Sequence, residues 1–227
     1  MARSLGNCNK GPSPYKIGPK ILKFSAVHED LGIKIDRKLK FHEHIRDTAN
    51  VCNALTNIFC STLCREPEFL LNIYKSLIRP KLEYGSQIWN LGYLGDLRLL
   101  ERVQRKWTKR VEGLGELPYP DRLRQLDLYS VQGRLLRADL IQTWKIFAGE
   151  CAVSCGELFV QDQSTRRGHC RKLYLPRADL EIRRRCFSVR VVRVWNSLKN
   201  ETVSAPSLNV FKSLLHGDLG QKLYDHA

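Results

Sequence analysis

The sequence has no uninterrupted apolar run that approaches the ~18 residues needed to cross a bilayer. The residues after Met1 also lack the apolar stretch of a secretory signal. We therefore expect an intracellular protein without a membrane partner, with the nucleus and the cytoplasm both open as its location. In such a reducing compartment the eight cysteines are expected to be thiols rather than disulfides.

Several signatures of catalysis are absent as well. Phosphoryl transfer by two metal ions requires two or three converging carboxylates, but the 227 residues contain no Asp-Asp pair, and their acidic residues are scattered. The sequence also lacks a phosphate-cradling GxxxxGK[ST] loop and a Gly-x-Ser-x-Gly turn. We therefore expect no catalytic residue, no metal ligand and no cofactor in this chain.

A zinc site is the alternative that the cysteines leave open. Cys151 and Cys155 are followed by His169 and Cys170. Because the last two are adjacent, they are poorly spaced to complete a tetrahedron around the metal. The pattern therefore favours thiols without a metal ion.

What the sequence has in excess is positive charge. The formal net charge is +15, and 43% of the residues are hydrophobic, which is enough for a packed core. An excess of this size indicates an acidic partner, with phosphate backbones as the leading class. A solvated basic surface without a partner is the alternative.

The N-terminal part is expected to be a flexible leader at residues 1–14 and a short β element at 15–36. The apolar segments Tyr15–Ile17 and Ile21–Phe24 flank Gly18-Pro19, which predicts a hairpin. Apolar and polar residues alternate over Leu31–Ile35, which predicts a third strand.

From Phe41 the apolar period becomes helical, and residues 37–148 are expected to form a helical region. A second helix is predicted to begin at Pro67 and end at Pro80, a third to span Leu94–Val111, and a short one to span Asp121–Leu126. The residues predicted to face the core are Ile45, Ala49, Cys52, Leu55, Phe59, Leu63, Phe69, Ile73, Leu77, Leu97, Leu100, Val103, Trp107, Val111, Leu136, Leu140, Thr143 and Phe147.

The C-terminal part is divided in the same way. Residues 149–178 lose their periodicity and are expected to be a loop or linker, 179–216 a helical segment, and 217–227 a tail. Within the helical segment we predict one basic helix over Leu180–Leu198 and a last helix after Pro206 that buries Val210, Phe211 and Leu214. The predicted fold class is mainly α, a helical bundle with a short N-terminal antiparallel β element.

An ordered set of segments resembles the region beyond the catalytic palm in jockey-like reverse transcriptases of non-LTR (LINE-type) retrotransposons. The resemblance extends over roughly residues 15 to 215. It rests on Asp30-Leu-Gly-Ile-Lys-Ile-Asp36, Tyr74-Lys-Ser-Leu-Ile-Arg-Pro-Lys-Leu-Glu-Tyr-Gly-Ser-Gln-Ile-Trp-Asn90, Leu100-Glu-Arg-Val-Gln-Arg105, Leu136-Arg-Ala-Asp-Leu-Ile141 and Val194-Trp-Asn-Ser-Leu198.

The resemblance implies a thumb and post-thumb region, with 15–36 as a palm remnant and 37–148 as a thumb-like bundle. In the family the aspartates that bind Mg²⁺ lie upstream of the segment matched by Asp30, so this chain is expected to be inactive alone. Its implied role is a non-catalytic part of an RNA-directed DNA polymerase. The implied partners are RNA or an RNA–DNA hybrid, and the missing palm and fingers polypeptide.

Phosphate backbones are expected to be contacted by basic residues on helix faces and in turns. Trp89 and Trp195 are candidates for stacking on bases, but their apolar neighbours favour core packing. The residues predicted to bind nucleic acid are Lys38, Lys40, Arg79, Lys81, Arg102, Arg105, Lys106, Arg183, Arg184 and Arg185.

Two other functions stay open. The chain is a protein-interaction module if Ile21, Phe24 and Ile33 expose an apolar surface. It is the remnant of a dead element if its departures from the family reflect drift. One departure is Gly133, which interrupts a predicted helix at a cost of about 0.5–1 kcal/mol relative to alanine.

Overall fold

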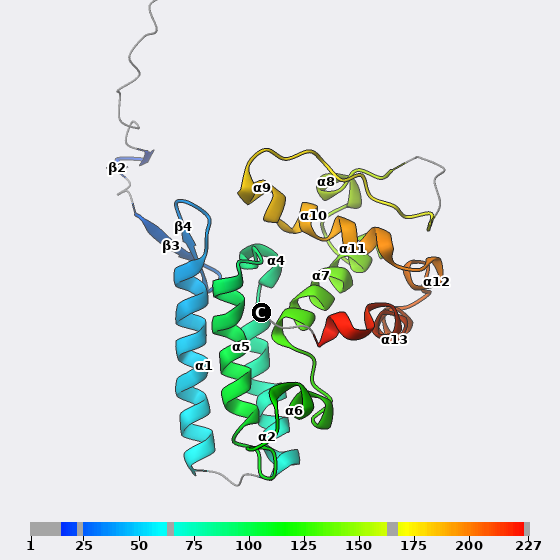
Figure 1. Ribbon diagram of the computed structural model, residues 1–227. Helices are drawn as coiled ribbons and strands as arrows, with labels where there is room; N and C mark the ends of the chain where they lie inside the picture. The colour runs from blue at the N-terminus through cyan, green and yellow to red at the C-terminus, as the bar shows by residue number, and fades with distance from the viewer. Residues whose placement is uncertain (1–14, 22–24, 63–65, 163–167, 225–227) are drawn as a thin grey trace, which may run out of the picture.

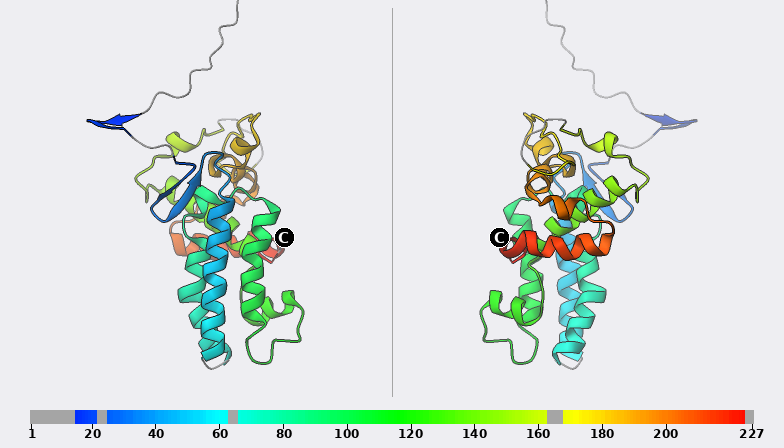
Figure 2. Two further views of the ribbon diagram at one scale, coloured as in Figure 1. Left: turned by 90° about the vertical axis from the view of Figure 1, so that its left-hand side faces the viewer. Right: turned by 90° about the vertical axis from the view of Figure 1, so that its right-hand side faces the viewer.

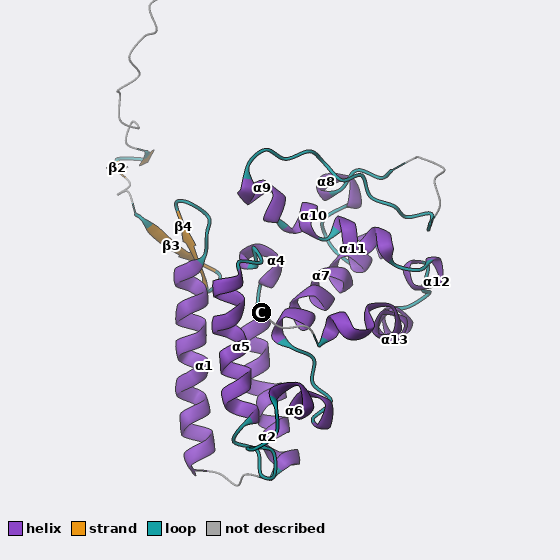
Figure 3. Cartoon of the chain, viewed as in Figure 1, coloured by secondary structure: helices purple, strands orange, loops and turns teal. Residues whose placement is uncertain are grey.

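The computed structural model of the protein describes residues 15–21, 25–62, 66–162 and 168–224. The described part is mainly helical, with two small antiparallel sheets near the N-terminus (Figure 1, Figure 3). The predicted fold class, mainly α with a short N-terminal antiparallel β element, is therefore confirmed. The predicted leader at 1–14, Phe24 and Leu63 lie outside the described residues.

The β element consists of two separate hairpins. β1 (Lys16–Ile17) pairs with β2 (Lys20–Ile21), as the Gly18-Pro19 turn predicts. The predicted third strand is observed as β4 (Ile33–Asp36), but it pairs with β3 (Val27–Asp30), which the periodicity did not predict. Three of the four residues of β3 are polar and exposed. The strand therefore lacks the alternation of apolar and polar residues from which a strand is predicted.

The N-terminal bundle is formed by three helical rods that lie side by side (Figure 1, Figure 2). The first and third rods bury the stripes predicted for them, except that Leu55 and Phe59 are only half-buried. The helices of this part are α1 (His42–Thr62), α2 (Pro67–Ile73), the π-helical turn η1 (Tyr74–Ile78), α3 (Arg79–Glu83), α4 (Ser86–Trp89) and α5 (Leu94–Thr108).

The second rod differs from its prediction, because Pro80 does not end it. The N–H of Arg79 bonds the carbonyl of Tyr74, five residues back, so the hydrogen bonding shifts by one residue before the proline. Pro80 then lies in the first turn of α3, where no N–H is required. The stripe that faces the core is Leu70, Tyr74, Ile78 and Leu82, whereas the predicted Phe69 and Leu77 are exposed and Ile73 is half-buried.

The N-terminus of α7 (Val131–Ala148) is capped from α5. The buried carboxylate of Glu101 accepts a hydrogen bond from the N–H of Val131 at 2.9 Å. The hydroxyl of Ser130 accepts one from the N–H of Gly133 at 2.9 Å. These acceptors satisfy N–H groups that have no partner inside the helix, and a carboxylate is also favoured there by the helix dipole.

The core forms two clusters, and α7 belongs to both. Val131 and Leu135 pack in the first cluster with the N-terminal bundle. Leu140, Trp144 and Ile146 pack in the second cluster with the C-terminal helices. The helix ends at Gly149, whose φ of 74° lies in the left-handed region that glycine adopts at low cost. α7 is therefore the element that joins the two halves of the structure.

The C-terminal layer packs on α7 (Figure 1). Residues 149–178 are mostly irregular, but Phe159 and Leu173 are buried in the second cluster. The remaining elements are α6 (Tyr119–Gln125), α8 (Cys155–Leu158), α9 (Glu181–Arg185), α10 (Phe187–Arg190), α11 (Val192–Ser197), α12 (Asn200–Val203), α13 (Leu208–Leu219) and the 3₁₀ turn η2 (Gly220–Leu223).

The single basic helix predicted over Leu180–Leu198 is wrong, because the chain is broken at Cys186. This residue has extended backbone angles, with φ −66° and ψ 154°. The segments before and after Cys186 are held by different parts of the structure. Arg185 donates to the carbonyl of Leu91 at 3.1 Å, and Arg190 forms an ion pair with Asp139. Such contacts override a local helical preference.

Smaller differences occur at helix ends. α5 ends at Thr108 rather than Val111, and Val210 is exposed instead of buried. Leu219 and Leu223 are buried, so this part of the predicted tail packs in the core.

The cysteines of the described residues are free thiols. None of the helices in the described part combines the length and the apolar character that a bilayer crossing requires.

Candidate nucleic-acid interface

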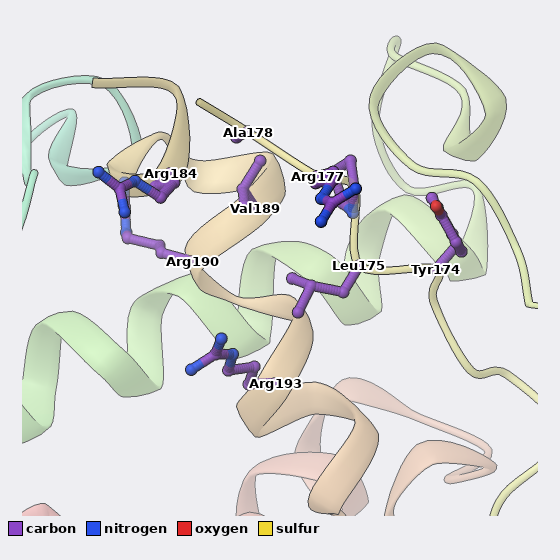
Figure 4. Close-up of a pocket in the computed structure, with 9 residues that line it drawn as sticks. Tyr174, Leu175, Arg177, Ala178, Arg184, Val189, Arg190 and Arg193 are labelled. Carbon is purple, nitrogen blue, oxygen red and sulfur yellow. The ribbon is translucent and has the colours of Figure 1, made fainter. Parts of the chain in front are cut away.

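A basic cavity lies in the C-terminal layer, between the loop before α9 and helices α9 to α11 (Figure 4). Its volume is about 790 Å³, which is in the range of small-ligand sites. We call it the arginine pocket. It is lined by Tyr174, Leu175, Pro176, Arg177, Ala178, Arg184, Val189, Arg190 and Arg193.

One wall of the arginine pocket is fixed by backbone hydrogen bonds. The side-chain amide of Asn196 accepts from the N–H of Leu173 at 2.9 Å and donates to its carbonyl at 2.7 Å. The N–H of Tyr174 donates to the carbonyl of Val160 at 2.8 Å. The indole of Trp195 donates to the carbonyl of Arg171 at 2.8 Å. These bonds, which include an isolated antiparallel bridge between Gln161 and Leu173, hold the irregular loop before α9 in place.

The opposite wall exists because of the break at Cys186. In a continuous helix, Arg184 and Arg193 are nine positions apart, which places them about 180° apart around the axis. With the break, both side chains line the same cavity (Figure 4). The irregular backbone at this point is therefore what assembles the basic site.

Arg190 has a structural role in the arginine pocket. Its guanidinium forms a bidentate ion pair with Asp139, with distances of 2.8 and 2.9 Å. It also donates to the carbonyls of Arg185 and Ser86 at 3.2 and 3.3 Å. Because Asp139 is 3% exposed on α7, this pair fastens α10 to the central helix.

The other three arginines are available to a ligand. Arg177, Arg184 and Arg193 are exposed. Within the described residues none of them forms an ion pair, and no acidic residue lines the cavity. A concave site with three uncompensated guanidinium groups attracts anions, and guanidinium geometry suits phosphate oxygens.

The residues predicted to bind nucleic acid do not gather in one place. Only Arg184 lines the arginine pocket. Arg183 is exposed beside it on α9, whereas Arg185 points to the α4–α5 loop and stacks on Tyr93, with its guanidinium carbon 4.4 Å from the ring centre. Lys38 and Lys40 are exposed in the turn after β4, whose backbone N–H groups are held by Asp36.

The carboxyl of Asp36 organises that turn. Burial pushes its pKa upward, but the backbone N–H groups of Phe41, Lys38 and Lys40 outweigh this effect and lower the pKa below the usual value of an aspartate. The carboxylate is therefore ionised at neutral pH and fixes the backbone, while both lysine side chains extend into solvent.

The predicted residues on α3 and α5 form two further groups. Arg79 is half-buried and lies 3.8 Å from Glu83, while Lys81 is exposed. On α5, Arg102 is exposed and Lys106 is half-buried, whereas the guanidinium carbon of Arg105 lies 4.7 Å from the ring centre of Tyr119.

The α5 group also borders a hollow. The cavity has a volume of about 250 Å³, with the buried carboxylate of Glu101 among its lining residues. That carboxylate makes the small hollow less attractive to anions than the arginine pocket. Its lining residues are Arg98, Glu101, Arg102 and Arg105.

Three residues of the arginine pocket were missed by the sequence analysis. Arg177 and Tyr174 lie in the aperiodic segment 149–178, where no pattern assigns a face, and Arg193 was read as part of a continuous helix. Of the two roles considered for Trp89 and Trp195, base stacking and core packing, the structure shows core packing. Both side chains are buried and are not accessible to bases. Ile33, a candidate for an apolar docking surface, is buried too.

The described residues are 15–21, 25–62, 66–162 and 168–224. No three histidine, cysteine, aspartate or glutamate side chains in these ranges gather closely enough to hold an ion.

His169 is buried and hydrogen-bonded to the backbone of Trp195 and Arg171. Its Nδ1 accepts from the N–H of Arg171 at 3.2 Å, so the proton is placed on Nε2, which faces the carbonyl of Trp195 at 3.0 Å. Burial lowers the pKa of His169 below its ordinary value, and burial does the same for His44.

The free energy of unfolding is therefore expected to fall as the pH drops below about 6.5, because the unfolded chain then binds protons that the folded one resists. Urea unfolding at several pH values measures this dependence, and NMR titration of the imidazole identifies the group. A His169 ring that titrates at or above the ordinary histidine value would contradict the expectation.

Comparisons with known proteins relate the chain to mobile-element polymerases. It is 26% identical over 117 residues to the RNA-directed DNA polymerase from mobile element jockey of Drosophila melanogaster, a match that covers 50% of this chain and 12% of the polymerase. It is 28% identical over 87 residues to the probable RNA-directed DNA polymerase from transposon X-element of the same organism, covering 37% of this chain and 10% of that protein.

A third relative is an uncharacterized protein of Caenorhabditis elegans, 29% identical over 139 residues, which are 58% of this chain and 68% of that protein. No family profile matches the chain, and no solved structure matches it. The matches to the two polymerases span about a tenth of each polymerase. The chain is thus distantly related to a region of non-LTR retrotransposon polymerases.

Proposed function

We propose that this chain is a non-catalytic, thumb-type segment of a retrotransposon RNA-directed DNA polymerase that binds RNA or an RNA–DNA hybrid without sequence preference. The observation that carries the proposal is the arginine pocket, with three exposed arginines that have no acidic partner among the described residues. The distant relation to mobile-element polymerases supports the same class of ligand.

The mechanism is phosphate neutralisation. Each arginine that contacts a phosphate releases condensed counterions, and this release favours binding at low salt. Contacts to the backbone fix the position of the strand but read no sequence. The exposed lysines of the β4–α1 turn and the basic residues of α5 extend the positive surface beyond the arginine pocket. By the same proposal, Mg²⁺ and the carboxylates that hold it belong to another part of the polymerase.

A salt titration tests this function. The triple variant Arg177→Gln, Arg184→Gln, Arg193→Gln is expected to reduce the slope of log K against log salt for a short RNA by about 2, because each lost phosphate contact removes roughly 0.7–0.9 from the slope. Fluorescence anisotropy at several salt concentrations measures the slope.

The matched control removes the same number of charges elsewhere. Lys16, Lys20 and Lys109 are exposed and do not line the arginine pocket. Their triple replacement by glutamine is expected to change the slope much less. Equal slopes for the two triple variants would show that only net charge matters. An RNA affinity of the unaltered protein that ignores salt would overturn the proposed function.

A further inference from the structure

Tyr174 is an exposed aromatic residue at the edge of the arginine pocket. It is 54% exposed, and its neighbour Leu175 is 39% exposed. Leu173, the preceding residue, is buried. Tyr174 lines the same cavity as Arg177, Arg184 and Arg193, and in Figure 4 its side chain lies at the Arg177 end of the cavity, with Leu175 between it and Arg193.

The position of this ring is defined by the fold. The backbone of Leu173 is held on both sides by Asn196, and the N–H of Tyr174 is bonded to the carbonyl of Val160. The Cα of Tyr174 is therefore anchored to the core although the segment is irregular. An aromatic ring on an anchored backbone loses little entropy when a planar ligand stacks on it.

The chemistry of the cavity contains two parts. Arg177, Arg184 and Arg193 supply positive charge for phosphate oxygens, and Tyr174 supplies a flat aromatic face. Nucleic acids are the biological polymers in which each repeating unit carries both a phosphate and a planar aromatic base. Both parts of one nucleotide reach this site only when the base is unpaired, because the faces of bases in a duplex are already stacked on their neighbours.

We propose that the arginine pocket is a site for single-stranded nucleic acid, with phosphates on the three arginines and an unpaired base stacked on Tyr174. This inference rests on the proposed function and adds a preference to it. Duplexes and hybrids bind by charge alone, whereas an unpaired strand gains a stacking contact. A base stacked on an aromatic side chain tolerates any sequence, because each base has an aromatic face.

The experiment compares three probes of equal length in fluorescence anisotropy: a single-stranded RNA, a single strand of the same charge whose central residues are abasic, and the same RNA in a blunt RNA–DNA hybrid, which carries about twice the phosphate charge. The unaltered protein is expected to bind the single-stranded RNA most tightly. Tyr174→Ala is expected to weaken that binding roughly 5- to 100-fold, since one stacked base contributes about that factor. Its affinities for the abasic strand and the hybrid stay unchanged.

Two control variants separate stacking from other effects. Tyr174→Trp keeps an aromatic face and is expected to retain the preference for the single strand. Tyr15→Ala removes a tyrosine that is 70% exposed just before β1, and the variant is expected to bind all probes like the unaltered protein. The salt slope of Tyr174→Ala should equal that of the unaltered protein, because no charge is lost.

The outcomes distinguish this inference from the proposed function. If the protein binds single strand, abasic strand and hybrid equally well, the single-strand site is excluded, and charge-driven binding stands. If Tyr174→Ala weakens all three probes alike, the residue acts through the fold and the inference fails as well. If the protein binds none of the probes at low salt, the proposed function fails together with the inference.

Discussion

Replacing Arg190 with leucine is expected to lower the free energy of unfolding by about 3–5 kcal/mol, the usual cost of removing one partner of a buried ion pair. The change leaves the carboxylate of Asp139 at 3% exposure without its guanidinium. It also removes the donor to the carbonyls of Ser86 and Arg185. Chemical unfolding monitored by circular dichroism measures the loss.

The loss should depend on pH in a characteristic direction. Burial raises the pKa of the Asp139 carboxyl even with Arg190 beside it, and leucine in that place raises it further. The folded variant therefore keeps a proton on Asp139 to higher pH than the folded unaltered protein does, so its deficit grows as the pH rises from the Asp139 pKa of the unaltered protein to that of the variant. A deficit that is the same at pH 5 and pH 8 (about one and four units above the unfolded pKa) would contradict a buried, unpaired carboxylate.

A double variant provides the control. Asp139→Leu together with Arg190→Met fills the same space with apolar side chains and leaves no buried charge. Such replacements are often neutral or stabilising. The double variant is therefore expected to recover most of the stability that Arg190→Leu loses. If it is as unstable as the single variant, the packing of α10 and not the unpaired charge accounts for the loss.

Replacing Gly133 with alanine is expected to destabilise the protein by about 1–3 kcal/mol, the typical cost of overpacking, although the same change stabilises an isolated helix by about 0.5–1 kcal/mol. A Cβ at this position would lie 2.2 Å from the carbonyl oxygen of Leu223 and 2.7 Å from its Cα. These are backbone atoms, so η2 must move. The movement also strains the bond from the N–H of Ser130 to that carbonyl, now 3.0 Å long.

Gly217 offers a matched control within a helix. It lies in α13, and a Cβ built there has nothing within 4 Å. Gly217→Ala is therefore expected to stabilise the protein by about 0.5–1 kcal/mol, in line with helix propensity alone. Thermal unfolding of the two variants in parallel should show shifts of opposite sign. A stabilising Gly133→Ala would mean that η2 does not approach α7 as closely as described.

The sequence predicted those elements whose burial follows a regular period. α1 and α5 were found because their apolar residues recur every three or four positions, and the core residues of α5 are the predicted ones. The rod around Pro80 was misread by one residue, because apolar residues stand at both registers: Leu70 faces the core and Phe69 does not, already in α2 and ahead of the π-helical turn. Gly133, taken as a local weakness, is explained by a contact 90 residues away in the chain.

The basic site was harder to predict, for a related reason. Net charge indicated an anionic partner, but it did not say which arginines are free. Arg184, Arg185 and Arg190 contribute equally to the net charge. However, a hydrogen bond to the backbone holds Arg185 and an ion pair holds Arg190, so these two side chains have structural roles. Arg177 and Arg193 meet Arg184 only because of the break at Cys186, which depends on contacts with residues far away in the chain.

The position of α7 in both core clusters has a consequence for how the molecule unfolds. Its first turns are capped by Glu101 and its middle is paired with Arg190, so neither half retains a complete helix without the other. A cut after Ala148 would leave the apolar faces of Leu140 and Trp144 in water. Calorimetry should accordingly record one melting transition, and the arginine pocket should be lost at the same temperature as the N-terminal bundle.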